Sequence, residues 1–134
     1  MARRLILDTG VLVDSERGDS WPAAAVADED DVVIAAITVA ELRTGVELGT
    51  DRHREQRSAF VDRVLQTLPV EAYDGSTAEA HALLLAHVHR NGLRSGAHDL
   101  VIAATAVAAR RTLVTTDRNA HFADLPGVTC IEVG

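Results

Sequence analysis

Short runs of aliphatic residues alternate with longer helical segments along this chain, and the alternation restricts the fold more than any other feature. Such runs are typical of strands that are buried on both faces. They lie at residues 5–7, 32–35, 69–73, 112–116 and 128–133, with 69–73 the weakest and expected at an edge. The pattern predicts an α/β fold, a three-layer sandwich in which helices cover both faces of a parallel sheet of about five strands.

Helical periodicity fills the stretches between these strands. We expect helices to open at Val11 and Thr38, and to occupy 21–27, 51–68, 76–90 and 97–111. Thr38 and Glu41 have the spacing of a capping box, and Asn91-Gly92 is a good helix end. Arg90, Arg110 and Arg111 are expected to interact with the carboxyl ends of helices. No repeat or linker divides the sequence, so we expect one domain over residues 1–134.

Composition excludes several classes of site. All 13 basic residues are arginine, and lysine is absent, which excludes a Walker-type phosphate loop and a Schiff base. Cys130 is the only cysteine, which excludes disulfide frameworks and cysteine zinc sites. The net charge of −7 argues against holding nucleic acid by bulk electrostatics and leaves room for a local basic patch.

The amino-terminal aliphatic run is too short to direct the chain to a membrane. Asp8 interrupts it after three residues, whereas the apolar core of a signal peptide needs about 7–15. No stretch approaches the roughly 20 apolar residues of a membrane span. We therefore expect the protein in a reducing cytoplasm.

Four acids are predicted to meet at one edge of the sheet. Asp8 ends the first strand, and Asp117 follows the fourth. Glu41 and Asp99 are expected in the first turns of two helices. Carboxyl ends of parallel strands and amino ends of the helices share one edge, where α/β proteins bind ligands. The sequence therefore predicts that these acids lie together.

Each acid also has a purely structural explanation. Asp8 has the position of a helix cap, and Glu41 that of the capping-box partner of Thr38. Asp99 complements a helix dipole, and Asp117 is placed to form a turn. These explanations do not account for four acids at one edge, because two carboxylates about 5 Å apart repel by roughly 3 kcal/mol at an effective dielectric of about 20.

A divalent cation would offset this repulsion. Oxygen-only ligands at a partly open site suit Mg²⁺ or Mn²⁺ rather than zinc. Such an ion binds phosphate oxygens and lowers the pKa of an attacking water, which points to phosphodiester hydrolysis. Zinc bound by His81, His87 and His89 is disfavoured, since spacings of six and two do not share a helical face.

Four motifs occur in register along essentially the whole chain: Asp8-Thr9, residues 38–42, residues 98–104 and residues 115–122. Together they resemble the PIN domain, and more narrowly the VapC-type toxins of bacterial toxin–antitoxin pairs. The resemblance implies a Mg²⁺- or Mn²⁺-dependent endoribonuclease that forms homodimers. It also implies inhibition by a VapB-type antitoxin that covers the acidic site.

The resemblance also assigns roles to individual residues. Asp8, Glu41, Asp99 and Asp117 become the catalytic metal ligands, with Thr9 and Thr116 in support and the Thr116 hydroxyl orienting the cluster. The side chains expected to contact RNA or the antitoxin are Arg43, Arg94, His98 and Arg118. The chain departs from the family at Gly10, where many relatives have serine, and at residues 95–98, where many have a proline-containing loop.

Three other interpretations compete with this one. Asp8-Thr9-Gly10 is also the active-site tripeptide of aspartic proteases, but that fold is all-β. A haloacid-dehalogenase-like phosphatase needs a second aspartate at position 10 and a lysine, which this chain lacks. The main alternative is a catalytically silent PIN module that binds RNA or a protein partner.

Overall fold

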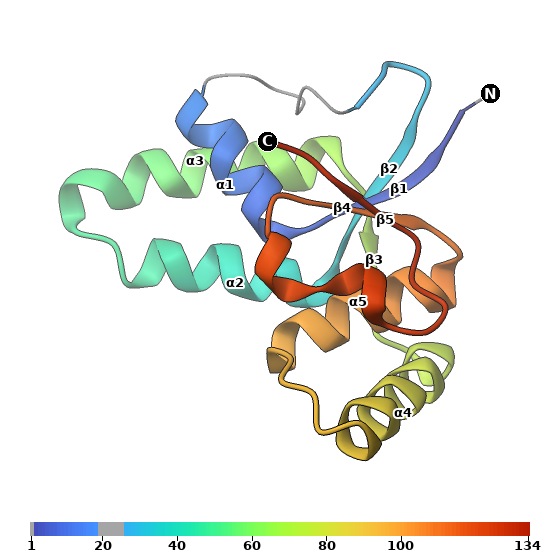
Figure 1. Ribbon diagram of the computed structural model, residues 1–134. Coiled ribbons are helices and arrows are strands. Elements are labelled where there is room, and N and C mark those ends of the chain that lie inside the picture. The colour runs from blue at the N-terminus through green and yellow to red at the C-terminus, as the bar shows by residue number, and fades with distance from the viewer. Residues whose placement is uncertain (1, 19–25) are drawn as a thin grey trace.

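The computed structural model describes residues 2–18 and 26–134, which form a five-stranded parallel sheet with helices on both faces (Figure 1). The order of the strands is β3-β2-β1-β4-β5. Their bounds are β1 (Arg4–Leu7), β2 (Asp31–Ala35), β3 (Val70–Glu71), β4 (Thr112–Thr115) and β5 (Cys130–Glu132). All four neighbouring pairs are parallel. The expected α/β architecture is confirmed, including the weak strand at the edge.

Five α-helices and two short 3₁₀ helices connect the strands in the described residues. They are α1 (Thr9–Gly18), α2 (Ala36–Glu47), α3 (Asp51–Thr67), α4 (Gly75–Arg90), α5 (Ala97–Ala109), η1 (Arg118–Ala120) and η2 (Phe122–Asp124). Helix α5 ends before the expected residue 111, because Arg110 adopts a left-handed backbone conformation with φ of 54°. Most of the helix expected over 21–27 lies outside the described residues.

The expected capping box at the start of α2 is wrong. The helix begins at Ala36, with Ala35 as its cap residue and no side-chain cap. Thr38 is therefore inside the first turn and fully buried. Its hydroxyl lies 3.2 Å from the hydroxyl of Thr9. Thr38 thus links α2 to the first residue of α1 instead of starting the helix.

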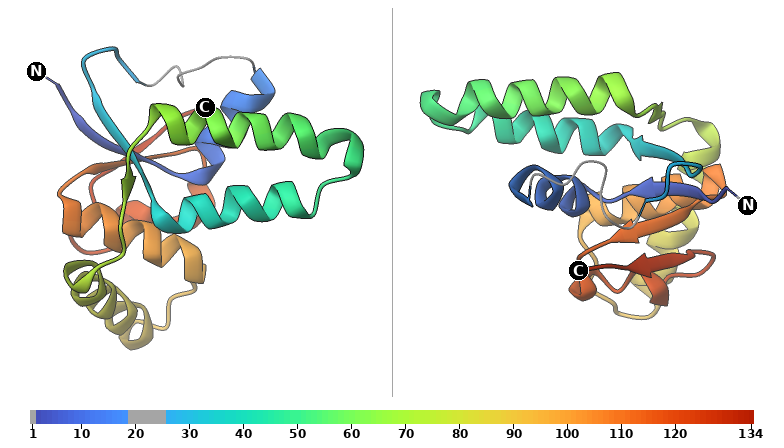
Figure 2. Two further views of the ribbon diagram at one scale, coloured as in Figure 1. Left: turned by 180° about the vertical axis from the view of Figure 1, so that it is seen from behind. Right: turned by 90° about the horizontal axis from the view of Figure 1, so that it is seen from above.

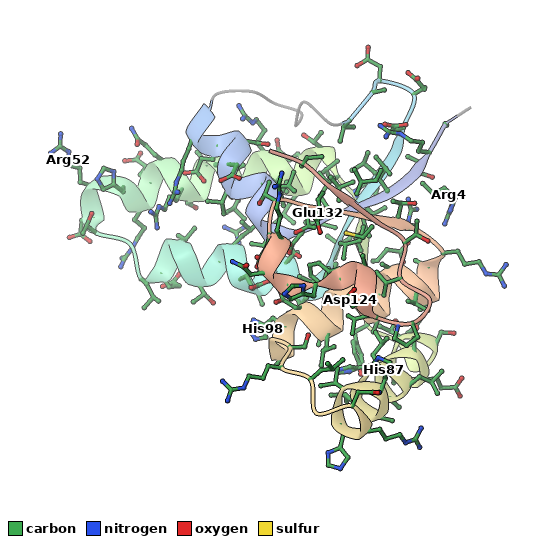
Figure 3. The ribbon with its side chains drawn as sticks, viewed as in Figure 1. Arg4, Arg52, His87, His98, Asp124 and Glu132 are labelled. Carbon is green, nitrogen blue, oxygen red and sulfur yellow. The ribbon has the colours of Figure 1, made fainter. Side chains whose placement is uncertain are left out.

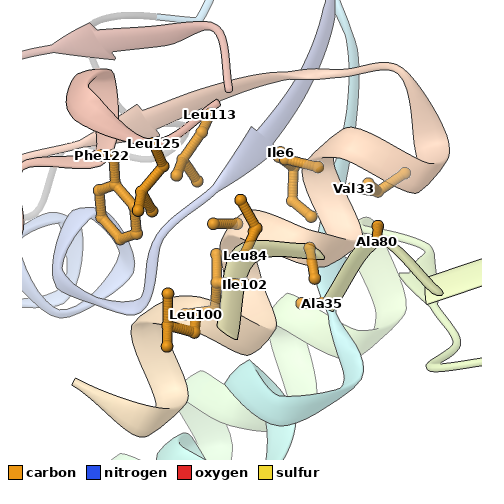
Figure 4. Packing of buried hydrophobic residues seen from close by; sticks show 13 residues of the cluster. Ile6, Val33, Ala35, Ala80, Leu84, Leu100, Ile102, Leu113, Phe122 and Leu125 are labelled. Carbon is orange, nitrogen blue, oxygen red and sulfur yellow. The ribbon is translucent and has the colours of Figure 1, made fainter. Parts of the chain in front are cut away.

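Two hydrophobic cores lie on opposite faces of the sheet. In β1, Leu5 and Leu7 contribute to one core and Ile6 to the other, as the alternation of side chains along a strand requires. The first core joins Leu5 and Leu7 to α1, α2 and α3. The second joins Ile6 to α4, α5 and the segment after β4, where Phe122 is buried (Figure 4). Both cores consist mainly of aliphatic residues, in keeping with an aromatic content of 3%.

Helices α2 and α3 form a hairpin that extends beyond the sheet (Figure 2). The exposed Leu48 follows α2 at the turn of this hairpin. None of the helices within the described part of the chain is both long and apolar enough to cross a membrane.

Arg111 does not interact with a helix end as expected. Its side chain is buried at the amino edge of the sheet, where Nη1 donates to the backbone oxygen and to Oδ1 of Asp31, both at 3.0 Å. Its Nε lies 3.7 Å from Oε1 of Glu71. One guanidinium therefore connects β4 to β2 and β3, on the edge opposite the acids.

Candidate metal centre

The four predicted acids lie at the carboxyl edge of the sheet, around its two central strands. Asp8 directly follows β1, and its amide donates to Val114 O of β4 at 2.9 Å. Asp117 lies two residues beyond β4, and Asp99 lies in the first turn of α5. Glu41 is the sixth residue of α2, one turn later than expected, because the helix begins at Ala36.

Asp8 is held in place by two hydrogen bonds. Its side chain accepts from the amide of Thr9 at 2.8 Å and from the hydroxyl of Thr115 at 2.8 Å. The residue is only 6% exposed, and this burial raises the pKa of Asp8. The charges of Glu41 and Asp117 raise this pKa further. Asp8 is therefore a fixed carboxylate in a negative environment.

The hydroxyl that orients Asp8 belongs to Thr115 and not to Thr116. The register of β1 with β4 pairs Leu7 with Val114, so the next residue along β4 reaches Asp8. Adjacent residues of a strand point to opposite sides. Thr116 accordingly points elsewhere, and its Oγ1 lies 2.9 Å from the position that a Cβ on Gly10 would take.

Glu41 is connected to β1 through Thr9. The Thr9 hydroxyl donates to Oε1 of Glu41 at 2.8 Å, which supports the expected role of Thr9 beside the acids. On the other side, Nδ1 of His98 lies 3.5 Å from Oε2 of Glu41. Figure 3 shows His98 at the amino end of α5. Helices from both faces of the sheet therefore meet at Glu41.

Asp99 has the most perturbed acidity in the cluster. Burial is the largest cause, followed by the charges of Asp8, Asp117 and Glu41, and together they raise the pKa of Asp99 to about 6. Its carboxylate folds back over Gly96, because a Cβ at that position would lie 2.9 Å from Oδ2 of Asp99. A side chain at position 96 would displace this carboxylate.

Asp117 has a structural role in addition to its place in the cluster. Its Oδ1 accepts from the amide of Asn119 at 2.9 Å, which is the turn-forming bond that the sequence also allowed. Its own amide donates to Oγ1 of Thr115 at 3.0 Å. Thr115 therefore positions two acids, one through its proton and one through its lone pair.

The donor set fits a hard divalent cation in chemistry and charge. All four acids supply oxygen, and the negative charges of Asp8, Asp117 and Glu41 raise the pKa of Asp99. Within residues 2–18 and 26–134, no three His, Cys, Asp or Glu side chains are arranged as a ready-made metal site. The fit therefore rests on ligand type and electrostatic coupling.

The arginines expected to contact RNA or an antitoxin are spread around this edge. Arg43 forms an ion pair with Asp62 of α3 at 2.9 Å, and Arg118 lies 3.9 Å from Glu132. Arg94 is exposed in the loop before α5. Contacts of these side chains with a partner remain predictions.

Gly10 is the place where a side chain would disturb the site. Its Cβ would lie 2.9 Å from Oγ1 of Thr116, and threonine has few alternative rotamers. We expect Gly10→Ala to lower the free energy of unfolding by about 1 kcal/mol, despite the better helix propensity of alanine. Urea unfolding followed by circular dichroism measures this change.

The matched control is the double variant Gly10→Ala/Thr116→Ala, which removes the clashing hydroxyl. It should recover most of the loss, and Thr116→Ala alone should be nearly neutral. Equal losses in the single and double variants would show that the contact is not the cause.

Comparisons with known proteins agree with this architecture. The PIN domain family model matches residues 5–128. Ribonuclease VapC5 of Mycobacterium tuberculosis is 37% identical over 131 residues, covering 96% of this chain and 92% of that protein. The crystal structure of VapBC-5, a member of the VapBC family of toxin–antitoxin systems from M. tuberculosis, superposes with a TM-score of 0.81 at 29% identity, covering 97% of this chain and 98% of that one. FitAcB from Neisseria gonorrhoeae superposes with a TM-score of 0.78 at 28% identity, covering 96% of each chain.

Proposed function

This chain belongs to the PIN domain family, within its VapC group, and on that basis we propose that it is a Mg²⁺- or Mn²⁺-dependent endoribonuclease that acts as the toxin of a toxin–antitoxin pair. The name of the M. tuberculosis relative, a ribonuclease, supports the reaction class. The toxin–antitoxin structure that this chain resembles supports the biological setting. The cation and the roles of the four acids are inferred from the chemistry of the site and from the resemblance to the family.

The observation that carries the assignment is the electrostatic coupling of four acids from separate elements. The charges of Asp8, Asp117 and Glu41 all raise the pKa of Asp99, to about 6. Clustering like charges in this way is costly for folding, and such clusters occur at functional sites. PIN-domain ribonucleases generally use a divalent metal, which matches this donor set.

In the proposed mechanism, Asp8, Glu41 and Asp99 would hold the cation, and Asp117 would complete the site or hold a second, weaker ion. The bound ion supplies charge neutralisation at the phosphate and a water of lowered pKa. Thr115 keeps the Asp8 carboxylate in one orientation through its 2.8 Å hydrogen bond, and Thr9 does the same for Glu41. Deprotonated Asp99 supplies negative charge, so its protonation near pH 6 weakens the site.

Partners are proposed on the same basis. We propose a VapB-type antitoxin that presents an arginine to the acids, because a guanidinium pairs well with clustered carboxylates. We also propose a homodimer and a larger toxin–antitoxin assembly. Finding a small DNA-binding protein encoded in the adjacent reading frame would support a toxin over a solitary nuclease.

The proposed function is tested by mapping the RNA ends that the purified protein produces. Water attacking a phosphodiester in line with the 3′ oxygen leaves a 5′-phosphate and a 3′-hydroxyl, so we expect only these ends. Activity should require Mg²⁺ or Mn²⁺ and should fall to background in excess EDTA. Sequencing libraries selective for each type of end distinguish the products.

A His98→Ala variant serves as the control for a different chemistry. His98 lies 3.5 Å from Glu41 and is a histidine at the site that could act as a base toward a ribose 2′-hydroxyl. Cleavage in EDTA with 2′,3′-cyclic phosphate ends would contradict the metal mechanism. RNA binding without cleavage, in the presence of Mg²⁺ or of Mn²⁺, would instead support the catalytically silent PIN module.

A further inference from the structure

A cavity of about 180 Å³ opens directly beside the acids, between α1, α2 and α3. Thr9 and Glu41, which belong to the acidic site, also line this cavity, so the two are continuous. Its volume is below the range of about 300–1,000 Å³ that is typical of drug-sized ligands. The cavity therefore has room for a single small group next to the reacting phosphate.

Part of the wall of the cavity is apolar, and a glycine leaves open space beside it. Val13 of α1, Leu42 of α2 and Val61 of α3 supply aliphatic surface from three helices. Gly45 lies on the same lining, and a Cβ added there would meet no atom within 4 Å. A flat apolar group can occupy this space because α2 has no side chain at that position.

Two arginines also line the cavity. Nη1 of Arg57 donates to the backbone oxygen of Gly45 at 3.2 Å, which holds the guanidinium beside the open position. Arg17, in the last turn of α1, has no ion partner among the described residues. Glu16 lines the same space. Arginine is well suited to binding phosphate, and both side chains are exposed to solvent, so donors outside these bonds are accessible to a ligand of that chemistry.

We propose that this cavity binds one base of single-stranded RNA, with the phosphate of that nucleotide at the mouth of the cavity, next to the scissile phosphate. The base packs on Val13, Leu42 and Val61, and its phosphate pairs with Arg17 and Arg57. With a net charge of −7 and four acids at the reaction site, the protein needs local cations to hold an RNA strand there. This inference rests on the proposed ribonuclease function, and RNA binding can be measured apart from cleavage.

The Gly45→Leu variant fills the cavity and tests the proposal. The new side chain has open space at its Cβ, and replacing a glycine within a helix favours folding by up to about 1 kcal/mol. We expect binding of a fluorescein-labelled single-stranded RNA, measured by anisotropy in the Asp8→Asn background, to weaken at least tenfold. RNA cleavage by Gly45→Leu alone should fall by a similar factor.

Hydrolysis of bis(p-nitrophenyl) phosphate in Mn²⁺ separates this cavity from the acids. That small diester needs only the acidic site, so Gly45→Leu should lose far less of this activity than of its RNA cleavage. Gly75→Leu is the matched control, since its Cβ also meets no atom within 4 Å and it lies in α4, outside the cavity. It should change neither RNA binding nor cleavage.

The arginines are tested by charge removal. Arg57→Gln should weaken RNA binding several-fold and reduce the slope of log Kd against log salt by about 1. Arg52→Gln, at the far end of α3 in Figure 3 and outside the cavity, should have a smaller effect on both.

Two results would overturn the inference. One is unchanged RNA binding and cleavage by Gly45→Leu; the other is a Gly45→Leu variant that loses affinity only for an antitoxin protein. If the unmodified protein cleaves neither RNA nor the small diester, the proposed function fails. The anisotropy comparison then still decides whether RNA occupies the cavity.

Discussion

RNA cleavage should fall at least about 1,000-fold when Asp8 is replaced by asparagine, while the fold is retained. A loss of this size corresponds to about 4 kcal/mol of transition-state stabilisation, which is within what a bound metal ion supplies. Asparagine has nearly the same shape as aspartate and lacks its charge. Because burial and neighbouring charges raise the pKa of Asp8, removing the charge should leave the metal-free protein equally or more stable. Initial cleavage rates and urea unfolding in EDTA measure the two effects.

Asp14→Asn is the control for this variant. Asp14 is an exposed acid on α1, in the helix that follows Asp8, and lies outside the acidic cluster. Its replacement should leave the cleavage rate within about twofold. Retention of more than a tenth of the activity by Asp8→Asn would refute the assignment of Asp8 as a metal ligand.

The metal-free protein should lose stability as the pH rises from about 4 to about 7. The pKa of Asp99 is about 6 in the folded protein and about 3.9 in an unfolded chain, so the folded state favours the protonated form. Its contribution to stability is therefore complete below pH 4 and disappears as the pH passes 6. The shift corresponds to between about 1 and 3 kcal/mol once solvent screening of the partly exposed side chain is allowed for.

The effect is measured as a difference between variants, because other acids titrate in the same range. Urea unfolding in EDTA at several pH values should show the unmodified protein losing stability relative to Asp99→Asn as the pH rises. Glu79→Gln, an exposed change on α4, should run parallel to the unmodified protein. Added Mn²⁺ should stabilise the unmodified protein more at pH 7.5 than at pH 5. Parallel curves for Asp99→Asn and the unmodified protein would contradict the raised pKa.

The sequence was sufficient to predict the sheet and the edge at which the acids meet. The aliphatic runs that precede Asp8 and Asp117 are long enough to be strands and too short to be helices. Strand direction then placed both acids at one edge. The small residues after Asp99 predict a helix, and this helix places Asp99 in its first turn. These are local patterns, so one sequence was enough.

Contacts that depend on register were beyond prediction. Whether Thr115 or Thr116 reaches Asp8 depends on how β4 aligns with β1, and a shift of one residue exchanges the two. Thr115 is identified by the register of β1 with β4, which pairs Leu7 with Val114, and no residue pattern in the sequence gives that register. The role of Gly96 was missed because it depends on the orientation of the Asp99 side chain. The start of α2 at Ala36 and the burial of Arg111 likewise result from tertiary packing.

Because the two cores lie on opposite faces of the sheet, the distances between the acids depend on how both helical layers pack against it. Glu41 lies on α2 in one layer, and Asp99 lies on α5 in the other. Strand β1 contributes residues to both cores. Each layer can therefore accumulate compensating changes within itself over evolution. The position of one layer relative to the other cannot change in this way without moving the acids apart. Selection for nuclease function should therefore act on the residues that fix the position of one helical layer relative to the other.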